Sequence, residues 1–422
     1  MICQRCMILL KTVSCHSVVF SMTNTTRNMV ALSKVLSSAQ QPNVVRNVAT
    51  KAKARTTEER KSRQASKIDK TAAHEKFPFL PIKASRHIYI LDTALAGEIA
   101  RAVTQNQEDV SVPVLEANPG TGVLTEALLK AGVNRIVLAE SLKEFIPYLE
   151  DLKTFSQKIM RVYNWDYLSV WRRLAEVECP YKHHEDQMAA LLPHKTWAES
   201  PPLSVVGVLA DKKDNVFLHH LLYSCAREYG LFLLGRPEWF IVISPATYKH
   251  LVTVKEDKNR TSRSFSRLAI MLHLVFEIRL CAELPAWKFT PSFPEKRQKL
   301  EDDTMSPSMR YLIRLRPHVE QQLPLSQIPV FLSFLSQVMS KKKQRFIPKM
   351  EQLIPGCGIH LIMSGFSMLA VIADVSPTQY VSIFKTMQTW PEYDGSPLKQ
   401  HLAESAVSES VIDDDEDSHK QD

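Results

Sequence analysis

Short apolar runs alternate with amphipathic stretches along the middle of the chain, from about residue 81 to residue 317. Seven of the apolar runs have the length and the Val, Ile and Leu content of buried strands: 112–116, 135–140, 159–163, 203–208, 238–244, 276–283 and 311–315. Stretches such as 124–131 and 216–229 carry apolar residues three and four positions apart, which is typical of helices. This alternation predicts an α/β fold of Rossmann-like type, with helices on both faces of a mostly parallel sheet.

The pattern changes after residue 317. Apolar residues then recur at helical spacing in three segments, 331–339, 347–353 and 377–388. We therefore predict a small helical C-terminal domain over 318–394, followed by an acidic disordered tail over 395–422. Two stretches interrupt the earlier alternation, at about 170–200 and 293–308, and both are predicted to be surface insertions in a domain over 81–317.

The N-terminal segment contains no Asp or Glu before Glu58, whereas Lys and Arg recur throughout it among Ser, Thr and Val. Segments of this kind are typical of mitochondrial presequences. We predict a presequence over 1–57, a basic flexible arm over 58–80, and a location in the mitochondrial matrix at the nucleoid; an ordinary disordered basic tail is the alternative. No stretch of about eighteen residues is both apolar and free of charge, so membrane insertion is not expected.

The charge of the chain points to an anionic partner. The formal net charge is +8 although acids are concentrated near the C-terminus, so the rest of the chain is more basic than the total suggests. A basic surface favours RNA or DNA, with a merely solubilising excess as the alternative. No metal site is predicted, because Cys3 and Cys6 lack a second pair and His183, His184 and His194 lack ligand spacing. The seven dispersed cysteines indicate a reducing compartment rather than a disulfide framework.

Three features that could hold a nucleotide-like cofactor follow successive predicted strands. The turn Asn118-Pro-Gly-Thr-Gly122 lies between the first strand and a helix, Glu140 ends the second strand, and Asp166 follows the third. The carboxyl ends of parallel strands share one crevice, where a carboxylate such as Glu140 can accept from ribose hydroxyls. Asp166 could accept from an adenine amino group. We predict a pocket for S-adenosylmethionine (SAM) or a nucleotide; the turn lacks the G-x-G-x-x-G of dinucleotide sites, and a turn retained for packing is the alternative.

Several motifs resemble those of one enzyme family. His87-Ile-Tyr-Ile-Leu-Asp92 matches Q-N-F-L-x-D, Glu116-Ala-Asn-Pro-Gly-Thr-Gly122 matches E-I-G-P-G-x-G, Arg267-Leu-Ala-Ile-Met271 matches R-L-S-V, Phe289-Thr-Pro291 matches F-x-P, and Met309-Arg-Tyr-Leu-Ile-Arg-Leu-Arg-Pro317 matches the last strand. On these residues the chain resembles the rRNA adenine N6-dimethyltransferase superfamily. The resemblance implies a SAM-dependent methyltransferase sheet with a small helical C-terminal domain. It also implies SAM contacts at Ile88, Ile90, Asn118, Gly120, Glu140 and Asp166.

The catalytic motif departs from the family pattern. After the fourth strand the family has N-L-P-Y, whose Asn orients the target amino group and whose Tyr stacks on the extruded base. This chain has Val208, Leu209, Ala210 and Asp211 there. Val208 carries no acceptor, and the loss of stacking costs on the order of 1–3 kcal/mol. The resemblance therefore predicts no working catalytic residue at this motif, and SAM retained, as a vestige, without efficient turnover.

Together with the predicted presequence, the altered motif resembles the mitochondrial transcription factor B group of that superfamily, of the second-paralogue type. This resemblance implies a factor that helps the mitochondrial RNA polymerase to melt promoter DNA and initiate. The alternative is a mitochondrial small-subunit rRNA adenine N6,N6-dimethyltransferase, with rRNA as its partner. Lys341, Lys342, Lys343 and Arg345 occupy the place of a basic family helix. We predict that they bind nucleic-acid phosphates, with a wholly solvated charge run as the alternative.

Overall fold

The computed structural model describes residues 75, 77, 78, 80, 87–168, 187–188, 190–210, 214–252, 266–291 and 309–408, with side chains to residue 403. The predicted presequence, nearly all of the basic arm and the insertion at 293–308 lie outside the described residues, as do His183 and His184.

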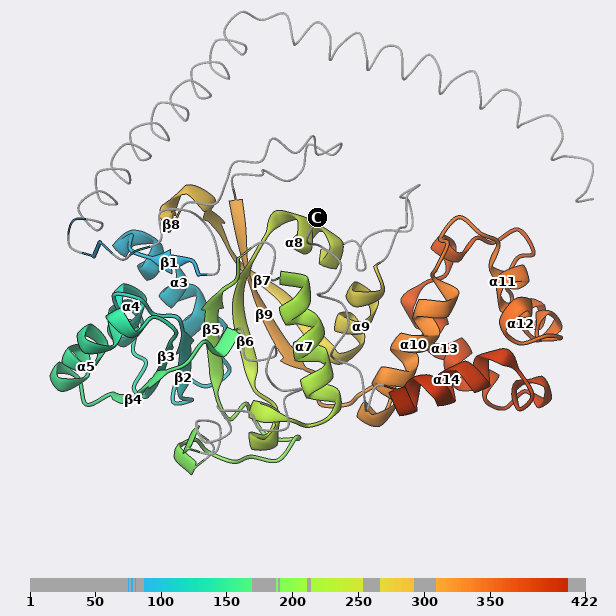
Figure 1. The fold of residues 1–422 in the computed structure, drawn as a ribbon, viewed down its shortest axis with the longest axis horizontal. Helices are drawn as coiled ribbons and strands as arrows, with labels where there is room; N and C mark the ends of the chain where they lie inside the picture. Colours follow the sequence, from blue (N-terminus) through green and yellow to red (C-terminus); the bar gives the residue numbers. More distant parts are fainter. Residues whose placement is uncertain are drawn as a thin grey trace, which may run out of the picture. The chain divides into compact units, whose positions relative to one another are not determined.

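A seven-stranded sheet in the order β4-β3-β2-β5-β6-β9-β7 forms the centre of the fold (Figure 1). Its strands are β2 (Val114–Ala117), β3 (Ile136–Glu140), β4 (Ile159–Asn164), β5 (Ser204–Val208), β6 (Glu238–Ile243), β7 (Phe276–Pro285) and β9 (Met309–Pro317). The five strands from β4 to β6 pair in parallel, whereas β9 lies antiparallel between β6 and β7. A short pair, β1 (Tyr89–Ile90) and β8 (Phe289–Thr290), lies outside this sheet. The predicted α/β fold class is confirmed.

Helices cover both faces of this sheet, as predicted. They are α3 (Thr93–Asn106), α4 (Val123–Lys130), α5 (Ile146–Phe155), α7 (Asp214–Ala226), α8 (Pro245–Val252) and α9 (Arg267–Val275). Successive strand residues belong to different hydrophobic clusters, with Val114 in one and Leu115 in the other, because side chains alternate across a strand. Both clusters are apolar, so the buried strands appear in the sequence as continuous apolar runs.

The C-terminal region is helical, as predicted, and consists of α10 (Ile328–Val338), α11 (Phe346–Leu353), α12 (Gly358–Met363), α13 (Pro377–Met387) and α14 (Pro397–Ser408) (Figure 1). Phe331, Phe334 and Phe384 pack at its centre, with ring centroids 5.0–5.9 Å apart. These rings belong to the same hydrophobic cluster as one face of the sheet. The change of pattern at residue 317 therefore separates two architectures that share one core.

The acidic tail begins later than predicted, because α14 occupies Pro397–Ser408. Leu398 and Leu402 lie four residues apart and are both buried, and His401 Nε2 lies 2.7 Å from Gln337 Nε2 of α10. The polar composition of the segment conceals this single apolar stripe, which is enough to fix a helix against a core. The acidic run itself lies outside the described residues.

The second half of the stretch predicted as a surface insertion at 170–200 is packed into the body. Met188 and Leu192 are buried in the core. Trp197 Nε1 donates to the His318 carbonyl at 3.1 Å, and Arg236 Nε donates to the Trp197 carbonyl at 3.0 Å. Residues 169–186 lie outside the described part. No helix in the described residues is long and apolar enough to cross a membrane.

A buried polar chain lies at the amino ends of β5 and β6. Gln107 Nε2 donates to Ser204 Oγ at 2.8 Å, and Ser204 Oγ donates to Glu238 Oε1 at 2.7 Å. Glu238 is fully buried, and burial raises the pKa of its carboxyl to about 7 against the pull of Ser204, Arg314 and Arg316. This carboxyl therefore ties the stability of the sheet to pH near neutrality.

Candidate functional site

The turn after β2 has the backbone that its glycines predict. Asn118, Gly120 and Gly122 all have positive φ, at 56°, 61° and 81°. A Cβ at Gly120 would lie 2.6 Å from Cδ1 of Tyr89, so only glycine fits without movement of that ring. The turn thus brings its backbone against the short strand β1.

Glu140 lies at the end of β3, facing this turn, where the sequence predicted it. Its Oε2 accepts from the Gly120 amide at 2.8 Å. Its Oε1 accepts from the Leu142 amide at 2.8 Å, from Ser141 Oγ at 3.2 Å and from the Tyr89 hydroxyl at 3.4 Å. The residue is fully buried, and burial is the main cause that raises the pKa of its carboxyl. Every one of these donors belongs to the protein.

The other predicted cofactor residues separate into two groups. Asp166 joins the turn, because Asn118 Nδ2 donates to its Oδ1 at 3.4 Å, and its Oδ2 lies 3.9 Å from His87 Nε2. Ile88 and Ile90 flank Tyr89 but are themselves buried in the core beneath α3 and α4. The structure therefore brings Asn118, Gly120, Glu140 and Asp166 together. It places the two isoleucines in the hydrophobic core.

Tyr89 is a part of this site that the motif comparison overlooked. It is 1% exposed, its ring packs against Phe145 with centroids 5.1 Å apart, and burial followed by the charge of Glu140 raises the pKa of its hydroxyl. The signal was present in the sequence, since Tyr89 stands where the related motif has Phe. A Tyr ring and a Phe ring have nearly the same shape, so the hydroxyl is the new chemical group.

As the residues lie, the Glu140 carboxylate is not accessible to the ribose of SAM. A bound ribose needs an accessible carboxylate, whereas Glu140 is fully buried and accepts four hydrogen bonds from protein groups. Beneath the same turn, burial raises the pKa of Glu116 to about 8, and Thr125 Oγ1 donates to its Oε2 at 2.7 Å. The crevice has the arrangement of a cofactor site, and its Glu140 carboxylate is occupied by two backbone amides and two side-chain hydroxyls of the chain itself.

We expect Tyr89→Phe to strengthen SAM binding by roughly two- to tenfold, because the variant removes one donor from Glu140 and keeps the ring, and a net hydrogen bond is worth about 0.5–1.5 kcal/mol. Titration calorimetry with SAM measures the change. Tyr148→Phe, a half-exposed tyrosine on α5, is the matched control. In the double variant Tyr89→Phe with Glu140→Ala, we expect no increase in SAM affinity. Equal dissociation constants for Tyr89→Phe and the unmodified protein would contradict this role of the hydroxyl.

Among the described residues at the end of β5, no side chain could orient an amino nucleophile. Val208 is half-buried against the α3 and α4 side of the sheet, Leu209 and Ala210 are buried, and the Leu209 amide donates to the Val242 carbonyl at 3.1 Å. Asp211 lies outside the described residues. Within the described part of the motif, the side chains thus serve packing.

The four predicted phosphate-binding cations lie in a loop rather than on a helix. Residues 341–345, which we call the basic loop, connect α10 to α11. Lys341, Lys343 and Arg345 are exposed, whereas Lys342 is half-buried. Burial, followed by the charge of Arg267, lowers the pKa of Lys342. The prediction of a helix here was wrong because the loop pairs through its backbone with residues 370–373.

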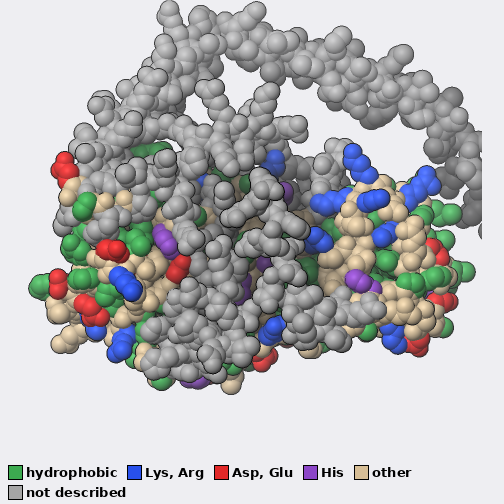
Figure 2. All heavy atoms as spheres, viewed as in Figure 1, with side chains coloured by type: hydrophobic (Ala, Val, Ile, Leu, Met, Phe, Trp, Pro, Cys, Tyr) green, Lys and Arg blue, Asp and Glu red, His purple; other side chains and the backbone are tan. Residues whose placement is uncertain are grey.

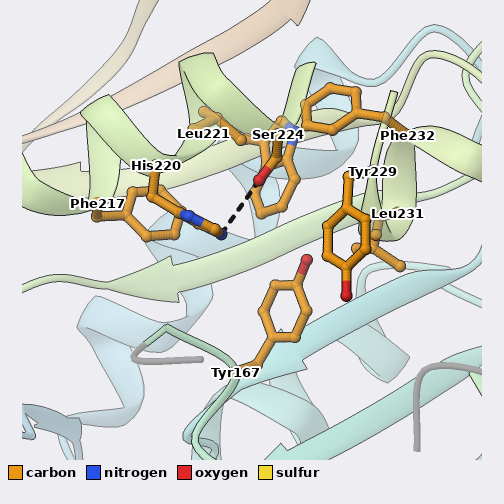
Figure 3. A pocket seen from close by; sticks show the side chains of 10 residues that line it. Tyr167, Phe217, His220, Leu221, Ser224, Tyr229, Leu231 and Phe232 are labelled. Carbon is orange, nitrogen blue, oxygen red and sulfur yellow. Dashed lines mark hydrogen bonds between the residues drawn. The ribbon is translucent and has the colours of Figure 1, made fainter. Parts of the chain in front are cut away.

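Two hollows lie away from the cofactor crevice. One is a small aromatic pocket on the other face of the sheet (Figure 3), where Tyr167 stacks on Trp239 and His220 Nε2 lies 3.1 Å from Ser224 Oγ. Burial lowers the pKa of His220 to about 4, so this ring is neutral. The other is a cavity of about 410 Å³. It lies among α7, α8, α9 and α10, and Arg267 is one of its lining residues.

A sheet in this order, with a glycine turn after one strand and an acidic residue at the end of the next, defines the class of SAM-dependent methyltransferase folds. The family model described as ribosomal RNA adenine dimethylase matches residues 87–389. The chain therefore belongs to the ribosomal RNA adenine dimethylase family.

Curated relatives have mitochondrial names. Mitochondrial dimethyladenosine transferase 2 of Drosophila melanogaster is 23% identical over 379 residues, which cover 79% of this chain and 82% of that protein. The protein of the same name from Bos taurus is 26% identical and covers 76% and 82%. Mitochondrial dimethyladenosine transferase 1 of Xenopus laevis is 26% identical over 48% of this chain and 53% of its own length.

Solved structures of two methyltransferases are similar to this chain. The 23S rRNA methyltransferase ErmE has a TM-score of 0.46 and 18% identity, covering 71% of this chain and 99% of that one. A dimethyladenosine transferase from Plasmodium falciparum has a TM-score of 0.42 and 10% identity, covering 76% and 97%.

Proposed function

We propose that this protein acts in the mitochondrial matrix, at the nucleoid, as a transcription initiation factor built on an rRNA adenine dimethyltransferase fold. In this role it helps the mitochondrial RNA polymerase to melt promoter DNA. The observation that carries the proposal is the end of β5, where Val208 stands in place of the Asn that orients the adenine amino group. A methylase without that acceptor loses the alignment of its nucleophile, which can cost orders of magnitude in rate.

Two further observations support the proposal. Glu140 is closed off by protein donors, so the cofactor crevice is vestigial in this function. The relatives named dimethyladenosine transferase 2 match over more of the chain than the transferase 1 of Xenopus laevis. The second candidate, a mitochondrial small-subunit rRNA adenine dimethyltransferase, is favoured by the family model itself.

The test is reconstituted initiation with the mitochondrial RNA polymerase of the same organism, run beside methyl transfer to the small-subunit rRNA helix. We expect the protein to stimulate initiation strongly at a closed promoter and less at a promoter pre-melted by mismatches. Methyl transfer is expected to be undetectable beside a family member with an intact N-L-P-Y.

A triple variant serves as the positive control for the enzyme assay. Val208→Asn, Ala210→Pro and Asp211→Tyr rebuild the family motif, and methyl transfer should appear in a background that also carries Tyr89→Phe. Efficient dimethylation by the unmodified protein, without any effect on initiation, would replace the transcription role by the rRNA enzyme.

A further inference from the structure

Exposed apolar side chains gather in one short segment of the C-terminal region. Ile359, Ile362 and Met363 are 63%, 47% and 81% exposed, and their spacing places them on one face of α12. Met368 and Leu369, which we call the apolar tip, are each 68% exposed in the loop that follows. Isolated exposed apolar residues need no explanation, but a cluster of five within eleven residues indicates a contact surface.

The apolar tip is tied to the basic loop by backbone hydrogen bonds. The Phe346 amide donates to the Ala370 carbonyl at 2.8 Å, the Ile372 amide to the Gln344 carbonyl at 3.0 Å, and the Ala373 amide to the Lys342 carbonyl at 3.1 Å. The tip itself is a tight turn, in which the Ala370 amide donates to the Ser367 carbonyl at 3.0 Å. Met368 and Leu369 are therefore held next to the end of the basic loop that carries Arg345. Figure 2 shows Lys and Arg side chains gathered over this part of the C-terminal helices, with hydrophobic side chains next to them.

The charge around the tip is mainly positive. Between residues 340 and 374 the chain has five Lys or Arg residues and two acids, Glu351 and Asp374. The Asp374 carboxylate accepts from the Val371 amide at 3.2 Å. The Glu351 carboxylate accepts from the Gly356 and Gly358 amides, so it turns back onto its own loop. A partner at this surface must combine negative charge with apolar groups that Met and Leu can reach.

Duplex DNA has both properties, since phosphates line its surface and stacked bases lie behind them. Proteins that bend DNA often insert Met, Leu or Ile between two base pairs, which unstacks that step while basic residues hold the backbone. The tip has the required shape, because its side chains project outward from a turn. An amphipathic peptide helix needs a hydrophobic groove instead.

We propose that Met368 and Leu369 form a wedge that enters a base step of promoter DNA while Lys341, Lys343 and Arg345 hold the neighbouring phosphates. This inference rests on the proposed function and names the way in which the same surface opens DNA. Unstacking a step has an energetic cost, which the phosphate contacts offset.

The experiment uses the full chain and a promoter duplex that carries 2-aminopurine at successive positions, whose fluorescence rises when the base unstacks. The wedge variant is Met368→Ser with Leu369→Ser. The matched control is Phe155→Ser with Leu233→Ser, which removes two apolar side chains from the body that are 87% and 65% exposed. All substituted residues are exposed, so circular dichroism should show that both variants fold.

We expect the wedge variant to lose the fluorescence rise and to keep the salt slope of DNA binding, while the control keeps both. An unchanged fluorescence rise in a wedge variant that binds DNA overturns the wedge and leaves the proposed function standing. Absence of salt-dependent DNA binding by the unmodified protein overturns both.

Two other classes of partner are outcomes of the same design. If the wedge variant unstacks DNA normally but no longer binds vesicles of anionic phospholipid, the tip is a membrane contact and the wedge is wrong. If it unstacks DNA normally but loses binding to the polymerase, the tip is a protein contact and the wedge is equally wrong.

Discussion

Alanine at Lys341, Lys343 and Arg345 is expected to lower the salt slope of DNA binding by about three units, because each phosphate contact on duplex DNA contributes about 0.9. The three side chains are exposed in one loop, so each is accessible to a phosphate of bound DNA. Between 50 and 200 mM salt, the triple variant should therefore lose about 40-fold less affinity than the unmodified protein loses. Fluorescence anisotropy with labelled duplexes at several salt concentrations measures both quantities.

Lys342→Ala is the matched control in the same loop, since its side chain is half-buried near Arg267. We expect it to change the slope by much less than any of the three exposed positions. The effect of the triple variant should also be the same for unrelated DNA sequences, because phosphates carry no sequence information. A triple variant with an unchanged slope would assign the basic loop to solubility.

Stability should depend on pH through Glu238. Its folded-state pKa of about 7 lies above the ordinary value of 4.5. A carboxyl whose pKa is raised in the folded state contributes stability in acid. This contribution is lost as the pH rises through 7, because the unfolded chain releases the proton more readily than the folded chain does. The difference of 2.5 pH units corresponds to about 3 kcal/mol. We therefore expect the free energy of unfolding to fall by about 3 kcal/mol more in the unmodified protein than in Glu238→Gln between pH 4.5 and pH 8.

Urea denaturation at a series of pH values measures this difference. Subtraction of the two curves removes the contribution of Glu116, which also titrates with a raised pKa and is present in both proteins. Glu150→Gln, a partly exposed residue of α5 that pairs with Lys153 at 3.2 Å, is the control and should run parallel to the unmodified protein. Parallel curves for Glu238→Gln as well would mean that the buried chain Gln107–Ser204–Glu238 does not couple stability to pH.

The strands were predictable because both faces of the sheet are covered. The run at 159–163 corresponds to β4, Ile159–Asn164, and the run at 276–283 corresponds to β7, Phe276–Pro285. An apolar run carries no information on direction, however. The antiparallel position of β9 between β6 and β7 depends on pairing with strands from elsewhere in the chain. The sequence predicted the strand and the structure decided its neighbours.

The C-terminal region shows where local pattern misleads. Lys341 to Arg345 are good helix formers by composition, yet backbone pairing with residues 370–373 holds them as a loop. Residues 397–408 show the converse, a helix where a tail was predicted. Leu398 and Leu402 lie in a polar segment and stabilise α14, because both side chains are buried in the core. Tertiary contacts overrode helix propensity in the basic loop, whereas in α14 they stabilise a helix that the polar composition had concealed.

The sequence by itself determined the fold class, the family and the edge of the sheet where the predicted cofactor residues lie. The fold class follows from local periodicity, the family from the resemblance of its motifs, and the shared edge from the rule that parallel strands end in one crevice. Only the tertiary structure decided that Glu140 is buried beneath Tyr89, because these two residues are 51 positions apart and meet through packing of β1 against the glycine turn. It also placed the apolar tip beside the basic loop. Contacts between distant residues depend on how whole elements pack, which no local pattern encodes.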